Sequence, residues 1–215
     1  MTNEKFIQDF TKPLRLGASQ DDAWYEPYKT ASKRHRNLSW NYDLLRSYSA
    51  AIGWVPPPCN KQPYNGERII FITDYNYSNT TAKHILQLLF YSQNENVLQI
   101  SLYLPKDMVN IHKLEDLTAS GVDKLRSLCL EFDDLYRTMS LVRIYKIERW
   151  QIMQQIVKSA HLLTKLFDID PSDLKLKSNI LCEYLFKMSD EAKKAFEDEI
   201  KDILRIDDKE WLLLK

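Results

Sequence analysis

The stretch from Arg68 to Leu104 constrains the fold more than any other part of the chain. Residues 68–72 form a short run rich in β-branched apolar residues, which is typical of a buried strand. Residues 82–90 carry apolar side chains at helical spacing, and the threonines before them can cap a helix. Residues 98–104 alternate apolar and polar side chains, as a half-buried strand does. A strand, a helix and a strand in this order predict a right-handed crossover between parallel strands, and therefore an α/β fold.

The rest of the chain divides into a helical part and an irregular part. Apolar residues recur at three- and four-residue steps over 122–132 and 147–167, which predicts helices that pack on a small sheet. Residues 1–64 hold six of the eight prolines and show weak periodicity, apart from a helix that we expect over 40–52. We therefore expect a domain of residues 65–215 preceded by an irregular N-terminal extension of residues 1–64.

The chain contains only four glycines, and no two of them are adjacent. Phosphate-cradling loops, dinucleotide-binding turns and nucleophile elbows each need several glycines within a short span, because glycine lets the backbone approach a ligand closely. We therefore expect no cofactor-binding residues. The histidines and carboxylates show no metal-ligand spacing, so we also expect no metal site.

The charge of the chain is balanced, with 30 lysines and arginines against 30 aspartates and glutamates. A dedicated nucleic-acid binder usually carries a basic excess, so we expect no nucleic-acid partner. The tract Lys33–Arg36 is a short basic run, which we interpret as solvated surface. Nucleic-acid binding through this tract is the remote alternative.

The sequence carries no sign of a membrane span or of secretion. No apolar run approaches the ~18 residues needed to cross a bilayer, and the first residues lack the basic and apolar regions of a secretory signal. Cys59, Cys129 and Cys182 are widely spaced and odd in number, which indicates neither a disulfide framework nor a zinc site. We expect a protein of a reducing intracellular compartment with no membrane partner.

The sequence contains few candidates for catalytic residues. His84 and His161 lie within predicted helices, where a structural role is the stronger interpretation, and Cys129 lies on an apolar helical face as a small core residue. His112 lies in a loop after a strand, where a catalytic histidine can stand. One open alternative is therefore a divergent serine or cysteine hydrolase in which His112 activates Ser140 or Cys129.

The strand–helix–strand stretch resembles the first repeat of the Clp protease proteolytic-subunit family. In that family a strand of RIIFL type precedes a helix ending in QLLFL and then a strand of I-x-LYINSPGG type, and the scaffold positions that match here are Arg68, Gln87 and Tyr103. Residues 163–166 and 187–192 are similar to the family's last segment, in which a helix start of FMSAEEA type follows a short turn. Pro56–Pro58 is similar to the proline-rich segment that precedes the first strand of the ClpR members, which are catalytically inactive and occur in plastids and cyanobacteria.

The catalytic features of active family members are missing from this sequence. Leu104–Met108 stands where active members carry the glycines of the oxyanion hole, and Leu185 stands where their acidic residue lies. No nucleophile turn of A-S-M-G type occurs between residues 105 and 160. The resemblance therefore implies a ClpP/crotonase-like α/β fold with a shortened middle, no catalytic residues and no enzymatic activity of its own.

By this resemblance the chain is a non-catalytic structural subunit of an ATP-dependent Clp protease core. The resemblance implies a place in a heptameric ring that is stacked on a second ring. The implied partners are ClpP- and ClpR-type subunits, which would carry out proteolysis, and indirectly a Clp AAA+ chaperone. The implied location is a plastid, such as the chloroplast stroma, with the cytoplasm of a cyanobacterium as the alternative.

Two sets of side chains are candidates for partner contacts. On the helix over 147–167, an arginine and an aromatic residue offer good interface anchors, and the candidate ring contacts are Arg149, Trp150 and Gln154. The alternative for Trp150 is the core of its own domain. Aromatic residues among charges in the N-terminal extension favour docking onto a partner, and these are Trp24, Tyr25, Tyr28 and Trp40. A stand-alone adaptor that binds a protein through this arm is the second open alternative.

Overall fold

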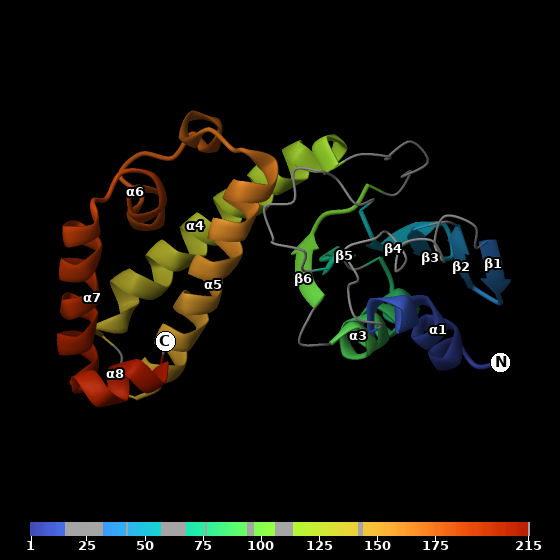
Figure 1. The fold of residues 1–215 in the computed structure, drawn as a ribbon, viewed down its shortest axis with the longest axis horizontal. Coiled ribbons are helices and arrows are strands. Elements are labelled where there is room, and N and C mark those ends of the chain that lie inside the picture. The colour runs from blue at the N-terminus through green and yellow to red at the C-terminus, as the bar shows by residue number, and fades with distance from the viewer. Residues whose placement is uncertain are drawn as a thin grey trace. The chain divides into compact units, whose positions relative to one another are not determined.

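The computed structural model describes residues 1–15, 32–41, 43–56, 68–75, 77–93, 97–105, 114–141 and 144–214. These residues form a mixed α/β structure (Figure 1). Contacts within the chain divide it into two compact units, residues 1–121 and residues 122–215. The first unit contains a sheet with helices, whereas the secondary structure described in the second unit is entirely helical.

The sheet of the first unit has six described strands in sequential order. They are β1 (Ser32–His35), β2 (Leu38–Asn41), β3 (Leu44–Ser47), β4 (Ala50–Trp54), β5 (Arg68–Thr73) and β6 (Val97–Leu102). Neighbouring strands from β1 to β5 pair antiparallel, and β5 pairs with β6 in parallel. The helix α3 (Asn79–Ser92) connects these two parallel strands, so the predicted strand–helix–strand unit is confirmed.

The prediction of a helix over residues 40–52 is wrong, because strands of four or five residues occupy this segment. Two tight turns reverse the chain around them. Each turn places a non-glycine residue in the left-handed region, with φ of 51° at Arg36 and 56° at Tyr48. The apolar residues that recur at helical spacing therefore lie in β3 (Leu44, Leu45), in the turn after it (Tyr48) and in β4 (Ile52).

The pairing of strands also shows that the domain boundary differs from the one we expected. We expected residues 1–64 to lie outside a domain of residues 65–215, but β4 pairs with β5 and joins the first four strands to the rest of the sheet. The start of the expected extension is also regular, because it forms the helix α1 (Asn3–Arg15). The structure thus divides the chain after residue 121 rather than after residue 64.

The core of the first unit lies between the sheet and two helices, α1 and α3, which pack against each other (Figure 1). Phe6 and Phe10 of α1 are fully buried, and Trp40 of β2 lies against both, with ring centroids 5.0 and 5.6 Å away. Gly53 of β4 lets α3 approach the sheet, because a Cβ at this position would lie 2.6 Å from Leu88 Cδ2. The N-terminal helix is therefore an integral part of this unit.

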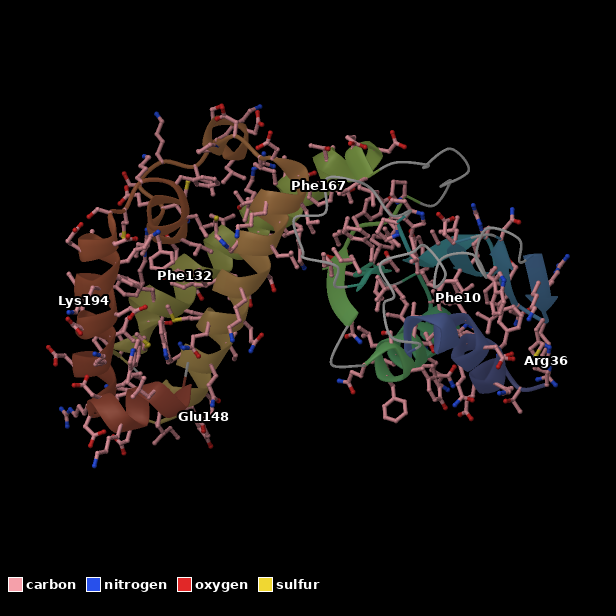
Figure 2. The ribbon with its side chains drawn as sticks, viewed as in Figure 1. Phe10, Arg36, Phe132, Glu148, Phe167 and Lys194 are labelled. Atoms are coloured by element: carbon pink, nitrogen blue, oxygen red, sulfur yellow. The ribbon has the colours of Figure 1, made fainter. Side chains whose placement is uncertain are left out.

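The second unit is a small helical bundle. Its helices are α4 (Thr118–Met139), whose first residues belong to the first unit, α5 (Lys146–Phe167), α6 (Ile180–Phe186), α7 (Asp190–Leu204) and α8 (Asp208–Leu214). The helices predicted over 122–132 and 147–167 are confirmed by α4 and α5. Phe132 of α4 is fully buried in this bundle, whereas Lys194 of α7 is exposed (Figure 2).

A buried asparagine ties α6 to α4 inside the bundle. The Asn179 side chain donates from Nδ2 to the carbonyl oxygen of Cys129 at 2.9 Å, and its Oδ1 accepts the backbone N–H of Cys182 at 2.9 Å. Asp133 Oδ1 accepts the N–H of Ile180 at 2.9 Å. These bonds satisfy the first turn of α6. Within the part of the chain that the structure describes, no helix is long and apolar enough to cross a membrane.

Candidate functional site

The described residues of the first unit form a concave surface at the β1 edge of the sheet, which we call the basic groove. It has a volume of about 560 Å³ and is lined by β1, by β2 and by the turns that precede β2 and β4. Three exposed cationic side chains line it, Lys33, Arg34 and Arg36, and its described lining contains no carboxylate. Arg36 lies at the periphery of the unit (Figure 2). The groove is therefore open to solvent and positively charged.

The meander brings these cations together through its register. Arg34 pairs with Ser39, and Ser39 pairs with Arg46 on the next strand, so these three residues form one row on one face of the sheet. Lys33 pairs with Trp40 on the opposite face, and its Nζ lies 4.8 Å from the centroid of the Trp40 ring. The cations thus flank the edge strand on both of its faces.

The two turns at the groove are tied to each other. The side-chain amide of Asn37 donates to the hydroxyl of Tyr48 at 2.9 Å, and the backbone N–H of Tyr48 donates to the carbonyl oxygen of Asn37. The residue Tyr48 nevertheless stays 55% exposed. The hydroxyl of an exposed aromatic residue is therefore held in place at the groove.

The local charge differs from that of the whole chain. Residues 32–54 contain four cations, Lys33, Arg34, Arg36 and Arg46, and one carboxylate, Asp43, which leaves a net charge of +3. The Asp43 carboxylate already accepts a hydrogen bond from Trp54 Nε1 at 3.1 Å. The meander thus carries more positive than negative charge, whereas the whole chain is balanced.

A second polar cluster of the first unit is buried. His84 on α3 is 3% exposed, with its Nδ1 2.8 Å from Ser47 Oγ and its Nε2 3.1 Å from Asn3 Nδ2. Ser47 Oγ also lies 3.3 Å from Thr81 Oγ1. Because the Asn3 amide donates to Nε2, the ring proton lies on Nδ1 and is donated to Ser47. Burial lowers the pKa of His84.

The Ser47 hydroxyl lies within hydrogen-bond distance of the histidine, but the Nδ1 that faces it carries the ring proton and so donates rather than acting as a base. The Ser47 side chain is also fully buried, so a substrate carbonyl has no path to its Oγ in this structure. The cluster joins α1, β3 and α3, and we assign it to packing. His84 thus has the structural place that the sequence indicated. Ser47 was missed, because only the pairing of β3 with its neighbours brings it near a histidine 37 residues away.

The predicted arm residues do not form one exposed surface. Trp40 is 5% exposed and packs in the core against Phe6 and Phe10, so its expected role as a docking contact needs correction. The apolar ring of Trp40 fills the core between α1 and the sheet. The periodicity of this segment was too weak to predict that Trp40 is buried. Trp24, Tyr25 and Tyr28 lie outside the described residues.

The candidate ring contacts on α5 are engaged within the second unit. Arg149 donates from Nη1 to Thr138 Oγ1 at 2.7 Å. Trp150 is 5% exposed and stacks on Trp211 of α8 at 5.1 Å, which is the core role that we kept as its alternative. Gln154 is half-buried and lines a pocket of the same unit. Trp150 is therefore not a surface anchor.

The scaffold positions that carry the family resemblance all lie on the strand–helix–strand unit. Arg68 begins β5, where it pairs with Val97. Gln87 is half-buried on α3, and Tyr103 follows β6 with 45% of its surface exposed. Their positions in the chain agree with the predicted elements.

The remaining catalytic candidates also stay apart. Cys129 is fully buried, and burial, with smaller contributions from Cys182 and Asp133, raises the pKa of its thiol to about 12. Ser140 is exposed after the end of α4. His112 and Cys59 lie outside the described residues. Among the residues that the structure describes, no three histidine, cysteine, aspartate or glutamate side chains are grouped as metal ligands.

A comparison of the chain with family models, with curated proteins and with solved structures finds no match.

Proposed function

We propose that the first unit is a binding module for single-stranded nucleic acid and that the basic groove is its binding surface. The groove itself carries this proposal, because cations on both faces of the edge strand, an exposed aromatic residue and side-chain amides all line it. The expectation of no nucleic-acid partner came from the balanced charge of the whole chain. That balance does not describe the meander, where the net charge is +3 over residues 32–54.

Phosphate groups are the first feature that this surface fits. A guanidinium group matches the geometry of a phosphate with two parallel hydrogen bonds, and an ammonium group adds a point charge. Arg34, Arg36 and Lys33 are all exposed at the groove, and Arg46 continues the row of Arg34 across the sheet. Such contacts position a strand without reading its sequence.

Unpaired bases are the second feature. Stacking of a base on an aromatic side chain contributes about 1–3 kcal/mol, and any base can provide it. The Tyr48 ring is exposed and held at its hydroxyl by Asn37, so little ordering is needed before a base stacks on it. Asn41 is exposed in the same groove and offers an amide to a base edge.

An acidic peptide is the competing anionic partner, since β1 is the edge strand of the described sheet and a peptide can add to such a strand by pairing with it. An acidic peptide uses charge and backbone hydrogen bonds, but it has no use for the exposed Tyr48 ring. The two partners therefore differ in their dependence on Tyr48.

The test is fluorescence anisotropy of the full chain with a labelled single-stranded oligonucleotide of about ten nucleotides. We expect salt-sensitive binding that weakens about tenfold in the double variant Arg34→Ala/Arg36→Ala. We also expect weaker binding by Tyr48→Ala. The matched control is Lys194→Ala/Lys209→Ala, which removes two exposed cations from the second unit and should leave the affinity unchanged.

Three results would refute the proposal. They are the absence of binding at low salt, equal loss in the control variant, and tighter binding of an oligoglutamate peptide that is insensitive to Tyr48→Ala. The last result would assign the groove to an acidic protein partner.

The second candidate is a non-catalytic structural subunit of a Clp protease core, located in a plastid or in the cytoplasm of a cyanobacterium. It is supported by the strand–helix–strand unit, in which α3 connects the parallel strands β5 and β6. This unit covers the stretch that resembles the Clp family. Native mass spectrometry of the chain mixed with ClpP-type subunits tests this proposal. Incorporation into a ring would support it, and a chain that stays monomeric in the mixture would exclude it.

A further inference from the structure

The second unit contains a pocket that the proposals above do not use, and we call it the aromatic pocket. It has a volume of about 180 Å³ and lies among α5, α6 and α7. Each helix contributes one aromatic wall, Trp150, Tyr184 and Phe196 respectively. The rest of the described lining is Gln154, Val157 and Lys158 from α5 and Glu197 from α7.

We propose that the aromatic pocket binds a methylated ammonium group, either on a free quaternary amine or on a methylated lysine side chain. The face of an aromatic ring carries negative charge density and attracts a cation, and methyl groups make that cation fit an apolar wall. Three aromatic residues and a carboxylate around one small cavity are the parts that this recognition needs.

The aromatic walls are held in place before any ligand arrives. Trp150 stacks on Trp211 of α8, with centroids 5.1 Å apart and planes inclined by 20°. Phe196 stacks on Tyr136 of α4 at 5.4 Å. The rings of Tyr184 and Phe196, which both line the pocket, are 5.9 Å apart and inclined by 54° to each other. A pre-organised wall loses little freedom when a ligand binds.

The rings of this unit already attract ammonium groups. Lys193 Nζ lies 5.6 Å from the centroid of Tyr184, and Lys201 Nζ lies 5.6 Å from that of Trp211. Both lysines come from α7, next to the pocket. The chain thus shows at these two rings the interaction that we propose for the cavity.

The two charged lining residues, Lys158 and Glu197, differ in their exposure to solvent. Glu197 is half-buried, whereas Lys158 is exposed and its long side chain can extend its ammonium group into water. The carboxylate is therefore less screened by solvent than the ammonium group. A carboxylate ligand would face Glu197 at the pocket wall, which disfavours aromatic acids as occupants.

The size of the pocket suits this group. An apolar cavity of about 150 Å³ inside a helical protein admits benzene. The aromatic pocket, at about 180 Å³, therefore has room for a trimethylammonium group, which is smaller than benzene. The rest of the ligand would extend out of the pocket, so both a small amine and a peptide side chain remain compatible.

The test is a titration of the full chain followed by nuclear magnetic resonance of the tryptophan indole signals. The probes are choline, a peptide with one trimethyllysine, and 3,3-dimethylbutanol, which replaces the ammonium of choline by a neutral carbon. We expect both cations to shift the Trp150 signal and the neutral analogue to bind at least about tenfold more weakly. The stronger of the two cationic probes identifies the source of the group.

A pair of variants on α7 provides the control. Glu197→Gln keeps the shape of the side chain but removes its charge, and we expect it to weaken choline binding about fivefold. Asp202→Asn makes the same change at an exposed position outside the pocket lining and should have no effect. Equal binding of the neutral analogue, no response to any cationic probe, or equal effects of the two variants would overturn the proposal.

Discussion

Acidification should destabilise the first unit through His84. The imidazole is 3% exposed, and its hydrogen-bond partners Ser47 and Asn3 carry no charge that could stabilise an imidazolium. Burial therefore lowers its pKa below the ordinary value of 6.5. In the unfolded chain the same imidazole titrates near its ordinary value. Between the two pKa values the unfolded state binds more protons than the folded state, so protons favour unfolding.

The sign and the size of the effect follow from this linkage. The stability associated with neutral His84 is complete above pH 6.5 and is lost as the pH falls below that value. The loss is at most about 1.4 kcal/mol per pH unit, until the folded imidazole also takes up a proton. Between about pH 7.5 and pH 5.5 the free energy of unfolding of the first unit should thus fall by up to about 1.4 kcal/mol, a factor of about ten in the unfolding equilibrium.

Hydrogen exchange followed by mass spectrometry measures this loss separately for the first unit, through peptides from α1 and α3. After correction for intrinsic exchange rates, these peptides should lose up to about tenfold protection between the two pH values. His84→Gln should remove the pH dependence. The matched control is His161→Gln in the second unit, where burial and then Lys165 and Lys193 also lower the pKa of the histidine. Flat protection in the wild type, or an unchanged slope in His84→Gln, would refute the reasoning.

Three further predictions concern packing and reactivity. Gly53→Ala places a Cβ 2.6 Å from Leu88 Cδ2 and should destabilise the first unit by about 1–3 kcal/mol. Urea unfolding measures this change, and an unchanged stability would show that the Leu88 side chain can move aside. Asn179→Ala removes the hydrogen bond to the carbonyl of Cys129 and leaves the N–H of Cys182 in the first turn of α6 without its side-chain acceptor, which should lower the stability of the second unit by about 1–2 kcal/mol. Thermal unfolding of the two proteins measures this difference. Because the pKa of the Cys129 thiol is about 12, iodoacetamide at about pH 8 should not modify Cys129 until urea unfolds the chain. Rapid modification of the folded protein that His112→Ala abolishes would instead support the hydrolase alternative.

The parts of the fold that the sequence predicts are those with long or distinctive periodicity. Residues 68–104 alternate between strand and helical patterns over enough residues for each period to show, and α5 spans 22 residues with its buried positions on one stripe. The meander of β1–β4 lacks both advantages. Its strands have four or five residues, too few to separate a period of two from a helical period.

The candidate site was hidden for a related reason. Turns between short strands are usually marked by asparagine and glycine at their centres, but here Arg36 and Tyr48 take up the positive φ. When the turn positions are not recognised, the pairing register of the strands cannot be predicted. The row of Arg34, Ser39 and Arg46 depends on that register, so the sequence did not reveal it. The sequence showed the basic tract Lys33–Arg36, but it did not show which residues of the other strands and turns lie beside this tract in the groove.

Non-glycine residues also end helices in this chain. The free-energy cost of using them in place of glycine can therefore be measured. Arg205 caps the C-terminus of α7 in the left-handed region, with φ of 58° and ψ of 47°. Such a conformation costs a residue with a Cβ about 1–2 kcal/mol, whereas glycine adopts it freely but loses about 0.5–1 kcal/mol more entropy on folding. Arg205→Gly should therefore stabilise the second unit by about 0.5–1 kcal/mol.

The matched control for this substitution lies on the same helix. Lys194 is exposed within α7 (Figure 2), where glycine is about 1 kcal/mol less favourable than a good helix former. Lys194→Gly should thus lower the stability that Arg205→Gly raises, although each variant replaces an exposed cation by glycine. Urea unfolding of both variants measures the difference. If both substitutions destabilise the chain equally, the left-handed residues at its turns and helix ends are not strained, and the lack of glycine has no energetic consequence for this fold.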